Sequence, residues 1–332
     1  MGKSISKGWT KNSSSGLYEY SVYDSAGTSR PVFDENGTLY SNGSSVASVY
    51  RKAYYVDSNG GADTNDGLSW DTAYKKLSIA LAASHANITA DSKGYAARNV
   101  IFFKGDQTKT AEGENLTALA QKTDIIGVGS TDWKSKPQLI GNVLVAATVS
   151  YMGCRFINVM FKGPVLVGGD IVKLTGQHGI EFINCEFMAD STTAATGAIT
   201  GIGCVGLAIR GCLFKGAFLD AVIELGAGQA DDFVVEDCFI QGANMGIDIA
   251  SDATYATGKN GRISNNTIKT TLACINDALA TTFVINNRLF TAAAEGILMA
   301  GVIVCGIKYA QDNRCTTSDK NNVIYPPEGT GA

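Results

Sequence analysis

The sequence predicts an all-β fold, a right-handed, single-stranded parallel β-helix in which short strands wind into a solenoid. The first observation is a short phrase that recurs from Cys154 to Cys315: an apolar residue, a free position, Asn or Asp, Cys or Asn, a free position and a second apolar residue. The copies are about 21 to 28 residues apart, a spacing typical of stacked repeats. The 38 glycines and 5 prolines suit many short strands joined by tight bends.

Each copy of the phrase is interpreted as a short strand that ends at a bend. It is too short for a helical pattern, and it places β-branched or aromatic residues beside turn-forming ones. Asn and Asp favour the bend because they tolerate left-handed backbone conformations, and stacked amides can form a ladder. Four clear and three weaker copies begin at Phe156, Phe182, Ile209, Val235, Ile263, Val284 and Ala310.

Cysteine recurs immediately after the bend, as Cys185, Cys212 and Cys238. A small apolar residue fits a tight interior corner, and free Cys behaves as one. The eight cysteines are therefore expected to be reduced thiols, as in a cytoplasmic setting, rather than a disulfide framework.

Residues 1–51 are predicted to form an extended N-terminal arm that attaches the chain to an assembly. Gly16 to Tyr23 alternates like a strand, and Arg30 to Gly43 contains two Asn-Gly turn signals. The segment has too few apolar residues for a core of its own, yet enough aromatic ones to dock on another surface. A flexible tail or a small hairpin is the alternative. The candidate attachment residues are Tyr18, Tyr20, Tyr23, Phe33 and Tyr40.

Residues 52–98 are predicted to form a strand, an Asp/Gly-rich loop and a capping helix ahead of the β-helix proper, 99–315, and a tail, 316–332. A cap is required because an open solenoid end is a row of unpaired strands. Asp71 or Thr72 can cap the helix start. The helix is expected from about Thr72 to Ala86, with an apolar face of Leu77, Ile79, Ala80 and Leu81.

The run from Tyr54 to Tyr74, followed by the repeats, resembles the right-handed parallel β-helix proteins of the pectate-lyase-like and phage-tailspike-like superfamily. The resemblance extends from about Tyr54 to Cys315 and implies the fold. It implies no single activity, because this fold carries lyases, hydrolases, phage tailspikes and inert virion proteins.

Charge and hydropathy argue against two classes of partner. The net charge of −4 and the absence of Lys/Arg runs disfavour nucleic acid. No apolar run approaches the roughly 20 residues that cross a membrane, and the N-terminus has no apolar signal core. Neither a nucleic-acid nor a membrane partner is expected.

The best catalytic candidates are Asp220, Glu224 and Asp248. Asp220 and Glu224 alternate with apolar residues and are expected to face outward along one strand, together with Val222. Such a patch offers a general acid and base for glycoside cleavage, which works with carboxyl groups about 5 to 10 Å apart, or a Ca²⁺ site. The alternative is an ordinary solvated or interface surface.

The position of Asp248 depends on register. Aligning Ile223 with Ile249, by their distances from the repeated cysteines, stacks Asp248 one rung above Val222 and diagonal to both acids. Asn276 is expected on the following rung.

Other residues carry weaker signals. A pectate-type lyase would need a basic residue beside the patch, and the pattern places neither Arg210 nor Lys215 on that face. His178 is expected to be a solvated bend residue rather than a base, and His85 is the other histidine. Trp70 and Trp133 are candidates either for sugar stacking or for packing.

The Asp/Gly-rich loop contains Asp57, Asp63 and Asp66 at close spacing. Hard oxygen ligands in such a loop suit Ca²⁺. Asp, Asn and Gly also form ordinary turns, so the loop has a purely structural interpretation. Otherwise no cofactor is expected.

Two functions from different classes remain. The first is a structural phage virion protein, a capsid decoration or cement protein that forms β-helical homotrimers on the head surface and binds the major capsid protein or another virion protein. The second is a tailspike-like protein that binds or cleaves a host-surface glycan as a hydrolase or lyase. About nine coils give a body only about 40 to 45 Å tall, and enzymatic tailspikes of this fold are usually longer. The structural function, on the virion after synthesis in the host cytoplasm, is therefore preferred.

Overall fold

The computed structural model divides the chain into two compact units, Met1–Lys52 and Ala53–Ala332. Side chains are described for residues 51–90, 98–105, 116, 120–129, 136–140, 153–163, 169–189, 195–225, 231–242, 244–249, 261–277, 282–291 and 313. For strands β1–β5, β10 and β28–β30 only the backbone is described, apart from residue 313 between the last two.

The N-terminal unit contains two small antiparallel sheets. β1 (Lys7–Lys11), β2 (Tyr18–Tyr23) and β3 (Ser29–Asp34) form one sheet in that order, and β4 (Tyr40–Ser41) pairs with β5 (Ser44–Ser45). The predicted strand around Gly16 to Tyr23 is confirmed as β2. The predicted turn residues Asn42 and Gly43 lie between β4 and β5 and outside the described residues.

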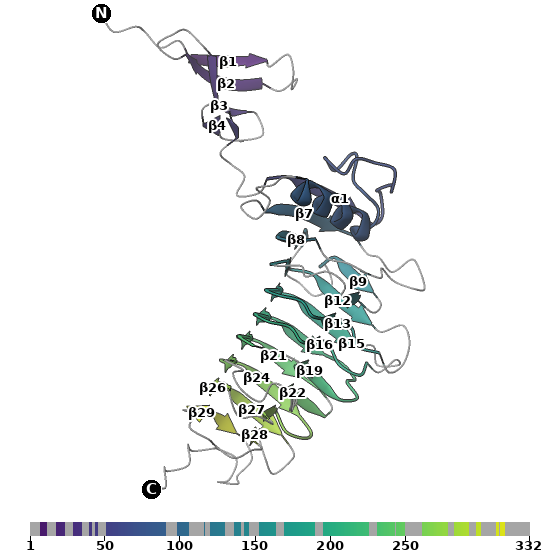
Figure 1. The fold of residues 1–332 in the computed structure, drawn as a ribbon, viewed down its shortest axis with the longest axis vertical. Coiled ribbons are helices and arrows are strands. Elements are labelled where there is room, and N and C mark those ends of the chain that lie inside the picture. The colour runs from purple at the N-terminus through teal and green to yellow at the C-terminus, as the bar shows by residue number, and fades with distance from the viewer. Residues whose placement is uncertain are drawn as a thin grey trace, which may run out of the picture. The chain divides into compact units, whose positions relative to one another are not determined.

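The second unit is the predicted parallel β-helix, which is confirmed: three parallel sheets run along it (Figure 1). The ten-stranded sheet consists of β6 (Ala53–Asp57), β7 (Asn99–Lys104), β8 (Thr123–Gly127), β11 (Arg155–Ile157), β14 (Glu181–Ile183), β17 (Ala208–Arg210), β20 (Val234–Glu236), β23 (Arg262–Ser264), β26 (Phe283–Ile285) and β29 (Ala310–Gln311). The eight-stranded sheet consists of β9 (Gln138–Ile140), β12 (Met160–Gly163), β15 (Glu186–Ala189), β18 (Leu213–Lys215), β21 (Phe239–Gln241), β24 (Thr267–Thr270), β27 (Arg288–Thr291) and β30 (Arg314–Cys315). The seven-stranded sheet consists of β10 (Val143–Val145), β13 (Val172–Thr175), β16 (Ile199–Ile202), β19 (Ala221–Leu225), β22 (Met245–Ile249), β25 (Ile275–Asp277) and β28 (Ile297–Met299).

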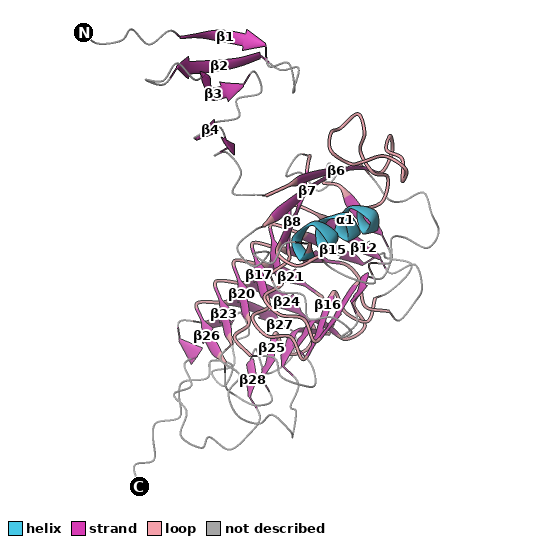
Figure 2. Ribbon diagram, turned by 45° about the horizontal axis from the view of Figure 1, so that its top comes forward, coloured by secondary structure: helices cyan, strands magenta, loops and turns pink. Residues whose placement is uncertain are grey.

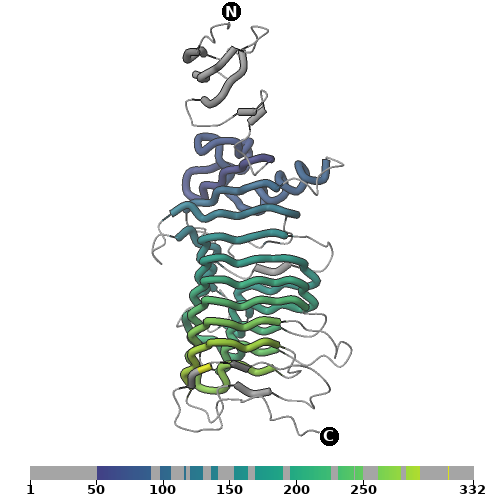
Figure 3. Tube along the Cα trace, turned by 90° about the vertical axis from the view of Figure 1, so that its left-hand side faces the viewer, coloured from purple at the N-terminus to yellow at the C-terminus, as the bar shows by residue number. Residues whose placement is uncertain are grey.

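From β11 onward each turn of the chain adds one strand to the ten-, eight- and seven-stranded sheets, in that order, and so makes one rung of the body. Strands of successive rungs pair in parallel, as β14 does with β17. Figure 3 shows the rungs stacked one upon the next. A strand therefore satisfies its backbone groups on its neighbours above and below, as stacked repeats require.

The repeated phrase is the bend between the ten-stranded and eight-stranded sheets. Its Asn, Asp or Gly lies between the two strands with a positive φ, which these residue types tolerate. The values range from 51° to 60° at Asn158, Asn184, Gly211, Asp237, Asn265 and Asn286. The prediction of a left-handed bend residue in each copy is confirmed at these six positions.

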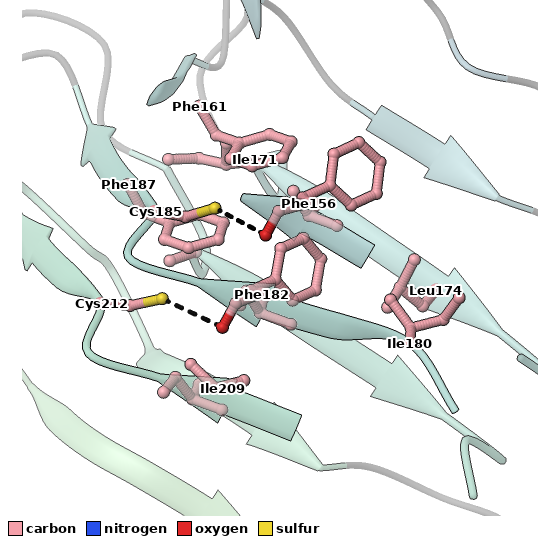
Figure 4. Packing of buried hydrophobic residues seen from close by; sticks show 14 of the residues in the cluster. Phe156, Phe161, Ile171, Leu174, Ile180, Phe182, Cys185, Phe187, Ile209 and Cys212 are labelled. Carbon is pink, nitrogen blue, oxygen red and sulfur yellow. Dashed lines mark hydrogen bonds between the residues drawn. The ribbon is translucent and has the colours of Figure 1, made fainter. Parts of the chain in front are cut away.

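The residue after the bend forms a hydrogen-bonded ladder inside the solenoid. In three rungs it is a cysteine whose thiol donates to a carbonyl of the preceding rung, as Cys185 does to Phe156 O at 3.3 Å and Cys212 to Phe182 O at 3.4 Å (Figure 4). All six cysteines among the described residues are free and buried. The expectation of a small interior residue is thus confirmed, and the thiols also act as hydrogen-bond donors.

Asparagine replaces cysteine in the following rungs of the ladder. The Asn266 amide donates to Val235 O at 2.9 Å and to Asn287 Oδ1 at 3.0 Å, while its Oδ1 accepts from the Cys238 backbone N–H at 2.9 Å. Asn287 is bonded to Asn313 in the same way. These amides are buried, so their bonds to one another offset the cost of removing them from water.

Stacked phenylalanines fill the interior beside the ladder. Phe161, Phe187 and Phe214 occupy one position in successive rungs, with ring centroids 4.9 and 4.7 Å apart and rings nearly parallel. Phe156 stacks on Phe182 at 5.4 Å (Figure 4). Because identical side chains repeat at the strand spacing, the core is continuous from rung to rung.

Helix α1 (Leu77–Thr89) packs on β6 and β7 at the first rungs of the body (Figure 2). Its buried residues include the predicted Leu77, Ala80 and Leu81. Within the described part of the chain no helix is long and apolar enough to span a membrane.

The predicted helix start was wrong. The N-cap is Lys76 and makes no side-chain capping bond. Thr72 instead hydrogen-bonds Asp66 through its hydroxyl at 2.6 Å, and Tyr74 pairs with Val56 of β6. Because these residues complete the loop and extend the first rung, the helix begins only after them. β6, expected within the capping segment, is itself the first strand of the ten-stranded sheet.

Candidate functional site

A column of polar side chains runs along the outer face of the seven-stranded sheet. Register pairs Lys173 with Thr200, Thr200 with Glu224, Glu224 with Asp248, and Asp248 with Asn276. Each residue lies between two buried apolar neighbours on its strand, except where Gly201 or Asp277 replaces one. We call these five residues the polar column. Neighbouring members are one strand spacing apart, about 4.8 Å.

Two further carboxylates lie at the turns that lead into this sheet. Asp170 precedes β13 and Asp220 precedes β19. A Cβ on Gly197 would lie 3.5 Å from Asp170 Oδ1 and 3.6 Å from Thr200 Oγ1, so the absence of a side chain at Gly197 leaves room for Asp170 beside the column. Asp220 donates its backbone N–H to Thr196 O at 3.0 Å, which stacks its turn on the preceding rung.

Three carboxyl groups of the site, those of Asp170, Glu224 and Asp248, have raised pKa values. Burial raises the pKa of Glu224, and the charges of Asp170, Asp248 and Asp220 raise it further, although Lys173 opposes them. The pKa values of Asp170 and Asp248 are also raised, first by burial and then by Asp220. The Asn276 amide donates to Asp248 Oδ1 at 2.7 Å and partly offsets the rise there.

The structure brings the three predicted acids together but corrects their register. Asp248 pairs directly with Glu224, not diagonally to it, because Ile223 pairs with Ile247 rather than Ile249. The reason is turn length: residues 216–220 separate β18 from β19, whereas only 242–244 separate β21 from β22. Asn276 follows on the next rung, as expected.

Two other expectations about the patch were wrong. Val222 does not face solvent: it is fully buried, and a Cβ on Gly242 would approach its methyl group to 2.3 Å. A basic residue does lie on this face, namely Lys173. Arg210 is on the ten-stranded sheet, where it forms an ion pair with Glu236, and Lys215 is on the eight-stranded sheet.

Sequence reasoning missed Lys173, Thr200 and Asp170. A signal was present, because Val172-Lys173-Leu174, Ile223-Glu224-Leu225 and Ile247-Asp248-Ile249 share one pattern of apolar, polar, apolar. If the strands are aligned one rung at a time from Glu224 toward the N-terminus, Lys173 occupies the equivalent position two rungs earlier. Asp170 carries no such pattern, since it lies in a turn of variable length.

The arrangement suits proton transfer. A carboxyl group with a raised pKa beside a second carboxylate is the usual combination for a general acid and its partner. Among the described residues, no three His, Cys, Asp or Glu side chains are grouped so that they could hold a metal ion.

In the Asp/Gly-rich loop each predicted metal ligand has a separate partner. Asp57 accepts from the Asn59 and Gly60 backbone N–H groups, both at 3.0 Å, and pairs with Lys104 at 3.1 Å. Burial raises the pKa of Asp57, but these partners outweigh it and the net pKa is lowered. Asp63 pairs with Lys76 at 3.2 Å, and Asp66 accepts from Leu68 N and the Thr72 hydroxyl. The carboxylates thus stabilise the loop individually.

The remaining candidates belong to other elements than the polar column or fall outside the described residues. Trp70 packs edge-on against Tyr55, and the Lys104 ammonium lies 4.5 Å from its ring centroid, so it is a packing residue. His178 pairs with Val205 in a bend, and His85 is on α1. Trp133 lies outside the described residues. The arm residues Tyr18, Tyr20 and Tyr23 are on β2, Phe33 is on β3 and Tyr40 on β4, and their side chains are likewise outside the described part.

Comparison with known proteins assigns neither a family nor an activity to the chain. No protein-family model and no curated protein matches the chain. Among solved structures, the pectate lyase Pel9A is similar, with a TM-score of 0.37, 12% identity, and coverage of 83% of this chain and 82% of that one.

Proposed function

We propose that the chain is a structural protein of a bacteriophage particle, in which the N-terminal unit attaches the β-helix body to a larger assembly. The observation that carries the proposal is the division of the chain at Lys52 into two compact units. A small unit with its own strands, separate from the repeat body, suits attachment because it leaves the body's pairing undisturbed. In the finer form of the proposal, the body is a decoration or cement protein that forms homotrimers on the head and contacts the major capsid protein.

The interior of the body supports a structural function. Ladder residues such as Asn266 and Asn287 bond rung to rung, and stacked phenylalanines extend the same connection through the core. Each rung thus holds its neighbours through backbone, amide and aromatic contacts. A stack of this kind resists local opening, which is what a particle surface requires.

Deleting Met1 to Val49 tests the attachment. The body retains its sheets and core, so the shortened chain should keep the β-rich circular dichroism and thermal midpoint of the full chain while failing to sediment with particles. The control is the N-terminal unit fused to an unrelated soluble carrier, which should sediment with them. Retained incorporation of the shortened chain would refute the attachment function.

Immunogold electron microscopy with antibody against the body tests the location. Label over the head supports a decoration protein, and label confined to the tail contradicts it. Absence of label from particles removes the structural proposal altogether.

A second function is favoured by one observation, the raised pKa values of adjacent Glu224 and Asp248. In this alternative the body cleaves a host-surface glycan, with Glu224 as general acid and Asp248 as its carboxylate partner. Glu224→Gln should lower the release of reducing ends at least about 100-fold, since general acid catalysis contributes on that order. Glu181→Gln, an isosteric change on the ten-stranded sheet, is the control. Activity unchanged in Glu224→Gln would exclude this site.

A further inference from the structure

The outer face of the eight-stranded sheet carries cations at regular intervals. Lys162 pairs with Met188, Met188 with Lys215, and Gln241 with Lys269, so the three lysines occupy one column at every second rung, about 10 Å apart. The neighbouring column contains Leu213, Phe239, Thr267 and Arg288 in successive rungs. We call these two columns the basic face.

The cations of the basic face have no ion-pair partner among the described residues. Ion pairs such as Glu236 with Arg262 and Asp124 with Arg155 lie on the ten-stranded sheet instead. Lys215, Lys269 and Arg288 are exposed. Phe239 beside them is 37% exposed, unusual for a large aromatic side chain. Glu186, which pairs with Leu213 and so extends the second column by one rung, is a carboxylate but is buried.

The acids of the same body are on the adjacent, seven-stranded face, and two rungs combine a cation of the basic face with one or more of these acids. Lys162 and Asp170 belong to one rung, and Lys215 belongs to the rung of Asp220 and Glu224. Among the residues whose side chains are described, the outer side of the seven-stranded sheet, which we call the acidic face, carries Asp170, Asp220, Glu224, Asp248 and Lys173, and the basic face carries Lys162, Lys215, Lys269, Arg288 and Glu186. Two adjacent faces of one body therefore have opposite charge.

The corner between these faces is apolar. Leu219, in the turn between β18 and β19, is 51% exposed, and Leu272, in the turn between β24 and β25, is 50% exposed. Asn244 connects them, since its side chain donates to Leu219 O and its own carbonyl accepts from Leu272 N. The exposed leucines thus lie in one row along the line where the basic and acidic faces meet.

We propose that the basic face of one copy of this chain docks on the acidic face of the next. Rotation about an axis parallel to the body keeps every rung at its own level, so Lys215 meets Asp220 and Glu224 of the neighbouring copy, and Lys162 meets Asp170. The contact is heterologous, and such contacts close into a ring when the rotation closes. The corner leucines then face the ring axis. This inference rests on the homotrimer included in the proposed function. It identifies the two faces through which neighbouring copies contact each other.

Charge reversal and its rescue test the docking. Sedimentation velocity of the full chain should show an oligomer at low salt that dissociates toward monomer near 1 M salt, where screening falls to about 3 Å. Lys215→Glu alone and Glu224→Lys alone should each weaken association about tenfold or more, as expected for loss of a close interfacial charge pair. The double variant, with both changes in every copy, should recover association to within about threefold of the wild type.

The control is Lys75→Glu, the same charge change at an exposed position before α1, which should leave association unchanged. The inference is overturned if the wild-type chain stays monomeric, or if the double variant associates no better than the single variants. Binding of polyglutamate by a monomeric wild type, lost in Lys215→Glu, would assign the basic face to an anionic polymer instead. Oligomerisation is measured without particles, so a chain that oligomerises but fails to join particles contradicts the attachment function alone.

Discussion

Removing one amide from the interior ladder should destabilise the body strongly. In Asn266→Ala three side-chain hydrogen bonds are lost: those to Val235 O, to Asn287 Oδ1 and from the Cys238 N–H. Three bonds at about 1 kcal/mol each, with about 1 to 3 kcal/mol more for a buried N–H that loses its acceptor, give about 4 to 6 kcal/mol. Asn266→Cys should lose about half as much, since the cysteines of the preceding rungs occupy the equivalent position and their thiols donate to the equivalent carbonyls.

Urea unfolding followed by far-UV circular dichroism measures this loss. The midpoint should fall in the order wild type, Asn266→Cys, Asn266→Ala, with the slope of the transition unchanged. Gln241→Ala, which removes an amide from the exposed face, should shift the free energy of unfolding by no more than about 0.5 kcal/mol. The reasoning is refuted if Asn266→Ala costs less than about 1 kcal/mol, or if Asn266→Cys is no more stable than Asn266→Ala.

Two further predictions concern the polar column and the bend. The folded-state pKa of Glu224 lies above its unfolded value, so its stabilising contribution is present below the unfolded pKa and is lost as pH rises through the folded one. Glu224→Gln should therefore gain stability relative to the wild type as pH rises above about 4 in thermal unfolding, and a difference independent of pH would contradict the assignment. Gly211 has a φ of 60° and no heavy atom within 4 Å of an added Cβ, so Gly211→Asn should be at least as stable as the wild type, whereas Gly211→Ala should lose about 1 kcal/mol. Equal stabilities for the two variants would show that the left-handed bend does not select Asn.

The fold was predictable because its information is local. Asn158, Asn184 and their equivalents recur where the chain must adopt a left-handed bend, and Cys185 or Asn266 follows wherever an interior corner must be filled. Each rung must form the same bend and fill the same interior position, so the same residue types recur in the sequence. The start of α1 was not predictable in this way, because Thr72 and Tyr74 are held by Asp66 and Val56 rather than by the helix.

The candidate site was predictable only in part. The alternation around Glu224 correctly placed it on an outer face, but the partner of Glu224 on the next rung depends on the length of a turn that the repeat does not conserve. Turn 216–220 is two residues longer than turn 242–244. The predicted partner of Asp248 on β19 was therefore wrong by two strand positions.

The sequence by itself determined the repeat, the bend residues, the interior thiols and the parallel β-helix, because these depend on what each short segment does to its own backbone and to an identical neighbour. Only the tertiary structure decided which side chains meet across rungs: Lys173 with the acids of the polar column, the asparagine ladder as a bonded chain, and opposite charges on adjacent faces. Those contacts depend on strand register, which is set by the lengths of all the turns in a coil. No single copy of the repeated phrase contains that information.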